Sequence, residues 1–140
     1  MLLSGRILGV SLILLGITLA TAAMAEEKHY VWQRDPGPIS GRWSATCEEM
    51  AGMVVEFSVA GRKATGRVSS LGKAGVFGYS VGENILQLEA DDYGDWVGKL
   101  QWRGLGSKPR WDPIRLVATS TQLNATMTTD NCYKKMPRAD

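Results

Sequence analysis

Histidine is almost absent from this chain, which has one, His29, among its 140 residues. General acid–base catalysis near neutral pH most often uses a histidine that a second polar group holds in place. The neighbours of His29 offer no such fixed partner, and no base is positioned to activate one of the serines. We therefore expect a protein that is not an enzyme and that carries no cofactor.

Metal-binding and nucleic-acid-binding patterns are missing as well. The chain contains neither Cys-x-x-Cys nor His-x-x-x-His, so zinc or thiol redox chemistry is not indicated. The acidic turn 91–95 has too few carboxylates for a typical calcium loop, and a plain hairpin turn explains it as well. Basic residues are scattered and the formal net charge is only +2, whereas nucleic-acid binding requires a concentrated basic face. We expect no bound metal and no nucleic-acid partner.

The first 25 residues have the pattern of a secretory signal peptide. One positive charge in MLLSGR is followed by the apolar run ILGVSLILLGITLA and by TAAMA, with small residues at Ala23 and Ala25. The alternative is an uncleaved anchor, although the apolar core is short for a membrane span. We predict cleavage after Ala25, export to the periplasm or the extracellular space, and no membrane attachment afterwards. Residues 26–40, which end in Pro-Gly-Pro, are predicted to form an arm that lies against the following domain.

Cysteine is scarce, with two residues, Cys47 and Cys132, that bracket most of the remaining chain. In an exported protein such a pair predicts one disulfide bond. On the chain-entropy model, closing so long a loop stabilises the fold by about 4–5 kcal/mol. Two separate buried thiols are the alternative.

From residue 41 onward, apolar and polar residues alternate with a period of two, and no stretch of ten residues has the helical period. Eight or nine short strands are expected, separated by turns rich in glycine, asparagine and aspartate: 42–47, 53–59, 64–69, 77–79, 86–90, 94–104, 114–118, 123–127 and 132–136. Glycines within the strands, Gly66, Gly78 and Gly98, suit the sharp bends of a small barrel. The pattern predicts one all-β domain over residues 41–138, an antiparallel eight-stranded β-barrel, with a β-sandwich as the alternative.

The opening Gly41-Arg42-Trp43 resembles the start of the calycins, the small barrels that include lipocalins and avidins. Trp96-Val97-Gly98 and Trp111 are also similar in style to avidin strands. The resemblance implies that Trp43 packs across the barrel floor beneath an arginine from the last strand, for which Arg138 is the candidate. The avidin Asn-x-x-Gly-Ser is replaced by Ser-Ala-Thr-Cys, so biotin binding is not implied.

A second resemblance is to small periplasmic inhibitors of C-type lysozyme. Thr46-Cys47, Met53–Phe57 and the glycine-flanked Tyr79 are similar to their cysteine, first strand and tyrosine loop. The Ser-Gly pair that precedes the tyrosine in those inhibitors is not matched here. This resemblance implies the alternative function, an inhibitor of a hydrolase such as a lysozyme or a protease.

Tryptophan is abundant, with five residues. Trp96 and Trp102 lie on one face of the expected strand 94–104, and Trp111 follows a loop that contains Lys108. Ligand pockets combine apolar walls with a few placed polar groups, so an aromatic patch with a cationic rim at one barrel end predicts a binding site. Its candidate residues are Trp111, Trp96, Trp102, Tyr79, Arg103, Lys108 and Arg110. The alternative is that these rings fill the barrel, with Trp111 alone partly exposed. We expect an exported, non-catalytic protein that binds a small molecule or a protein partner.

Overall fold

The alternation of apolar and polar residues produces eight antiparallel strands in the computed structural model, which describes residues 33–106, 108–126 and 131–140. The strands pair in chain order, β1 to β8, within a single sheet. Their bounds are β1 Gly41–Ser44, β2 Val54–Ala60, β3 Lys63–Ser70, β4 Asn84–Ala90, β5 Trp96–Trp102, β6 Arg110–Ala118, β7 Gln122–Ala125 and β8 Lys135–Pro137. The prediction of an all-β protein is confirmed.

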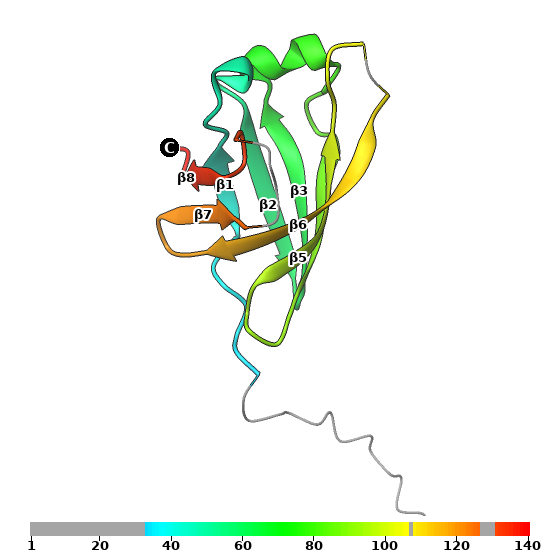
Figure 1. Ribbon diagram of the computed structural model, residues 1–140. Coiled ribbons are helices and arrows are strands. Elements are labelled where there is room, and N and C mark those ends of the chain that lie inside the picture. Colours follow the sequence, from blue (N-terminus) through cyan, green and yellow to red (C-terminus); the bar gives the residue numbers. More distant parts are fainter. Residues whose placement is uncertain (1–32, 107, 127–130) are drawn as a thin grey trace, which may run out of the picture.

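The sheet curls until its first and last strands meet, as Figure 1 shows for β1 and β8. Trp43 and Arg138 form a β-bridge, and the amide of Ala139 donates to the carbonyl of Arg42 at 2.9 Å. The amide of Thr46 donates to the carbonyl of Cys132 at 3.1 Å. One continuous sheet that nearly closes on itself is a barrel rather than a sandwich, so the barrel prediction is confirmed.

Inward-facing apolar side chains fill the barrel. Every second residue of the long strands points inward, and the described residues include no buried charged side chain. The largest buried side chains are those of Trp43, Trp96, Tyr133, Ile39, Met53, Ile85, Leu86, Ile114, Leu116, Leu123, Met136 and Val55. Because an eight-stranded barrel has just enough width for such side chains, most of its length is core.

The N-terminal arm closes one end of the barrel. Ile39 is buried, and the carbonyls of Gly37 and Ile39 accept hydrogen bonds from the indoles of Trp96 (2.9 Å) and Trp43 (2.7 Å). The arm is therefore tied to the barrel over its described part, from residue 33. The predicted signal peptide and residues 26–32 lie outside the described residues.

Arg138 covers Trp43 at this closed end, as the calycin resemblance implies. Its guanidinium lies 4.0 Å from the centre of the indole ring. The same guanidinium donates hydrogen bonds to the carbonyls of Ser40, Pro38 and Ser120, the last two at 3.1 Å. Arg138 thereby connects the arm, the β6–β7 turn and the barrel floor.

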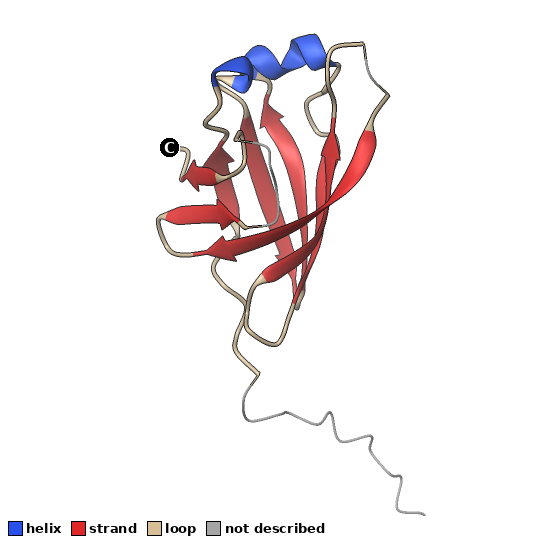
Figure 2. Cartoon of the chain, viewed as in Figure 1, coloured by secondary structure: helices blue, strands red, loops and turns tan. Residues whose placement is uncertain are grey.

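Two short 3-10 helices, η1 (Glu48–Met50) and η2 (Gly72–Phe77), lie at the opposite end, as Figure 2 shows in blue. The strand predicted for residues 77–79 is wrong, because Phe77 ends η2 and Gly78 turns the chain with φ of 89°. This left-handed conformation is easily adopted only by glycine. Within the described residues, no helix has the length and apolar character needed to cross a membrane.

Pro113 does not interrupt strand pairing, contrary to the expected start of a strand at residue 114. β6 begins at Arg110, and Pro113 pairs with Lys99 of β5. On its other side, β6 pairs with β7 only over Leu116–Ala118, which leaves a strand edge at Pro113. Proline lacks an amide proton and is compatible with such an edge.

Candidate binding site

A cavity of about 440 Å³ opens at the barrel end that carries η1 and η2. Its lining comes from η1, η2, β5, β6 and the segment before β8, which the closed sheet brings together (Figure 1). The lining residues are Cys47, Glu49, Phe77, Leu100, Trp102, Arg103, Gly104, Arg110, Asp112, Asn131 and Cys132. We refer to this space as the mouth cavity.

Apolar groups form much of its wall. Leu100 is buried, and the side chains of Phe77 and Trp102 are half-buried. A Cβ atom at Gly104 would lie 2.4 Å from the Trp102 ring, so a glycine is needed for the chain to pass this close to the indole. The Arg110 guanidinium lies 4.4 Å from the centre of the same ring. These contacts hold Trp102 in one position on the wall.

The two arginines of the wall each form an ion pair. Arg103 contacts Glu83 at 2.5 Å, and the Nε atom of Arg110 contacts Asp112 at 3.0 Å. Glu49, in contrast, makes no ion pair or side-chain hydrogen bond with any described residue. Among the described residues, the lining of the mouth cavity thus includes one exposed carboxylate, that of Glu49, without a cationic partner.

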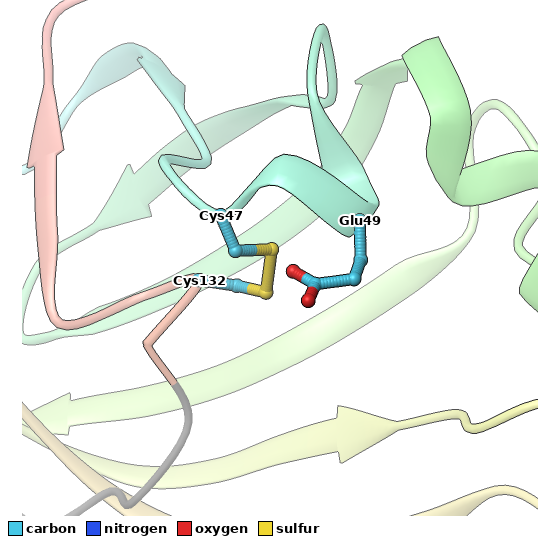
Figure 3. A group of neighbouring side chains, drawn as sticks. All are labelled: Cys47, Glu49 and Cys132. Atoms are coloured by element: carbon cyan, nitrogen blue, oxygen red, sulfur yellow. A yellow bond between two sulfur atoms is a disulfide. The ribbon is translucent and has the colours of Figure 1, made fainter.

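The predicted disulfide between Cys47 and Cys132 is present and forms part of the wall (Figure 3). The carboxylate of Glu49 points toward it, and its oxygen and the two sulfurs lie within 4.8 Å of one another. Sulfurs joined in a disulfide are not thiolates and do not bind a metal as zinc sites require. The cluster therefore acts as a wall of the cavity and not as a metal centre.

Trp102, Arg103 and Arg110 are the predicted site residues that line the mouth cavity. Tyr79 lies behind them. Its hydroxyl accepts a hydrogen bond from the amide of Arg103 at 3.0 Å and donates one to the carbonyl of Gln101 at 3.3 Å. The buried Tyr79 thus fixes the backbone on either side of Trp102.

The other three predicted residues lie elsewhere. Trp96 is 1% exposed and belongs to the closed end, because a strand of seven residues places its first and last residues about 20 Å apart. Trp111 is 40% exposed, as expected, but it faces outward, with the Lys99 ammonium 5.0 Å from its ring centre. Lys108 is exposed on the β5–β6 connection and does not line the cavity. The structure therefore does not bring the three tryptophans into one patch.

Sequence reasoning missed Glu49, Phe77, Leu100, Gly104, Asp112 and Asn131, which complete the lining. They come from separate segments with no common spacing, and only the strand order places them together. The two cysteines gave the one available signal, because their disulfide brings η1 beside the segment before β8.

The segment Gly78-Tyr79-Ser80-Val81-Gly82 has the Gly-x-Ser-x-Gly spacing of a hydrolase nucleophile turn. That turn joins a strand to a helix, whereas this segment joins η2 to β4. The described residues include no histidine, and Glu83 accepts a hydrogen bond from the Ser80 amide and not from its hydroxyl. The segment lacks the structural context of that motif.

The acidic turn between β4 and β5 uses its carboxylates within the fold. Arg115 contacts Asp91 at 2.5 Å and Asp95 at 2.9 Å, and Asp91 also accepts hydrogen bonds from the amides of Tyr93 and Asp95. Burial raises the pKa of Asp91, but the hydrogen bonds from Arg115 and the two amides outweigh it and hold that pKa below its ordinary value. The hairpin interpretation accounts for this turn without a bound cation.

Comparison of the chain with models of known protein families, with curated protein sequences and with solved structures gave no match. Its function is therefore argued from the mouth cavity.

Proposed function

We propose that this protein is an exported, non-catalytic binding protein that holds a small ligand in the mouth cavity. The observation that carries the proposal is a concave space of about 440 Å³ whose wall combines apolar and charged side chains. Small-molecule sites typically measure about 300–1,000 Å³ and place polar groups among apolar ones. The signal-like residues 1–25 and the disulfide support export, because such bonds persist in oxidising compartments.

The outer parts of the same barrel end favour a second candidate, an inhibitor that binds a hydrolase. Val76, Val81 and Leu105 are 69%, 63% and 72% exposed, on η2, the η2–β4 connection and the β5–β6 connection. Exposed apolar side chains on neighbouring connections are common where proteins associate. In this alternative the connections bind the partner and the mouth cavity is left for water.

Titration with N-phenyl-1-naphthylamine, a neutral apolar fluorescent probe, tests the proposal. We expect saturable 1:1 binding that Trp102→Ala weakens and that Trp111→Ala, on the outer face, leaves unchanged. Native mass spectrometry of the exported protein should also show a co-purifying small molecule. Absence of both signals, with a 1:1 complex formed with a hydrolase and lost in Leu105→Asp, would instead establish the inhibitor.

A further inference from the structure

We infer that the ligand of the mouth cavity is an organic cation, an amine or quaternary ammonium group on an apolar body, and that Glu49 binds its charge. The inference rests on the proposed function and specifies its ligand class. It starts from the charges of the wall. Arg103 and Arg110 are each paired with a carboxylate, whereas Glu49 has no partner among the described residues.

A carboxylate in this position selects against other ligands. An anion would be repelled by Glu49, and the two arginines of the wall already lie against Glu83 and Asp112. A neutral ligand can occupy the apolar part of the cavity but gains nothing from Glu49, which is exposed and hydrated. A cation gains the attraction of the carboxylate, which strengthens as the ligand excludes water.

The wall beside Glu49 suits an apolar body. Phe77 and Leu100 line the same cavity as Glu49. The disulfide lies beside the Glu49 carboxylate (Figure 3). The Trp102 ring already has the Arg110 guanidinium over it, but no described cation lies over the Phe77 ring. A ligand cation near Glu49 would therefore find an unoccupied aromatic face as well as a counter-charge.

Three probes of similar size test the inference by calorimetric titration at pH 7: 2-phenylethylamine, 2-phenylethanol and 3-phenylpropanoate. We expect the amine to bind about three- to fivefold more tightly than the alcohol or the carboxylate, the difference typical of an ion pair with an exposed carboxylate. Glu49→Gln should reduce the amine to the affinity of the alcohol.

Glu48→Gln is the matched control, because Glu48 is the preceding residue of η1, is exposed, and does not line the cavity. It should leave amine affinity within twofold of the wild type. Thermal unfolding of Glu49→Gln should match the wild type, since Glu49 makes no described polar contact that the substitution removes.

Equal affinity for the three probes, failure of the amine to bind, or an unchanged amine affinity in Glu49→Gln would overturn the inference. The neutral fluorescent probe decides separately on the proposed function. If that probe binds and the amine shows no preference, a ligand site exists but it is not cationic. If neither binds, both proposals fail.

Discussion

The four described tryptophans occupy three different environments, which their partners define. Trp43 and Trp96 donate to carbonyls of the arm and belong to the closed end. Trp102 lies on the wall of the mouth cavity beside Arg110, and Trp111 lies on the outer face beside Lys99. Of the four, only Trp102 lines the mouth cavity, although all four share the same side-chain chemistry.

Truncation of these tryptophans should separate core from cavity wall. Trp96→Ala removes a fully buried ring and should lower the free energy of unfolding by about 3–5 kcal/mol. Trp102→Ala should cost less, because its ring is half-buried and one side of it borders the cavity. Trp111→Ala, the exposed control, should cost about 1 kcal/mol or less. Urea unfolding measures all three, and an equal loss for Trp102 and Trp96 would place Trp102 in the core.

At the scale of single residues, the sequence predicted those that belong to a recognisable local pattern. The calycin resemblance of Gly41-Arg42-Trp43 implied a covering arginine, and Arg138 lies over the Trp43 ring. The loop before Trp111 correctly predicted its partial exposure. Glu49 stands in an acidic pair without periodicity, and nothing local indicates that it faces a cavity formed mostly by residues about 30 to 80 positions away.

At the scale of elements, the β4–β5 turn depends on ionised carboxylates. Because the pKa of Asp91 is lowered in the fold, its ionised form stabilises the protein above the unfolded-state pKa, whose ordinary value is 3.8. That contribution is lost as the pH falls through the lower folded-state pKa. Stability should therefore decline below about pH 4 partly through this turn.

Asp91→Asn tests this dependence, because it removes the charge that Arg115 binds. The variant should be less stable than the wild type at pH 7, and the difference should shrink as the pH is lowered toward 2. Urea unfolding across this range measures it, with Asp35→Asn as a control whose exposed side chain makes no described polar contact. A difference that stays constant with pH would show that the ionised state of Asp91 is irrelevant.

Most strands were predictable because alternation over five or more residues has no competing interpretation in this chain. The prediction failed at residues 77–79, where three residues are too few to distinguish a strand from the end of a 3-10 helix. It also failed at Pro113, where proline was expected to stop the pairing. Whether a strand position is an edge depends on the length of β7, which the residues around Pro113 do not encode.

At the scale of the whole molecule, two contacts hold β1 and β8 together along the seam where the sheet closes. Arg138 secures it at the closed end, and the Cys47–Cys132 disulfide secures it at the mouth. β8 has only three residues, so the strand pairing itself contributes little to closure. The disulfide is also part of the wall of the mouth cavity. The contact between β1 and β8 and the proposed ligand site therefore depend on the same bond.

Reduction of the disulfide should therefore lower both stability and affinity. The bond closes a loop between residues 85 apart, for which the chain-entropy model gives about 4–5 kcal/mol, enough to lower the unfolding temperature by about 10 °C or more. Affinity for the neutral fluorescent probe should fall at the same time, because η1 and the segment before β8 are no longer held together. Calorimetry and probe titration with and without a phosphine reductant measure the two effects, and a Cys47→Ser/Cys132→Ser variant should show both losses without responding to reductant. Unchanged probe affinity in the reduced protein would mean that the mouth cavity does not depend on the disulfide. Two thiols that react with an alkylating reagent in the native protein would show that the disulfide does not form.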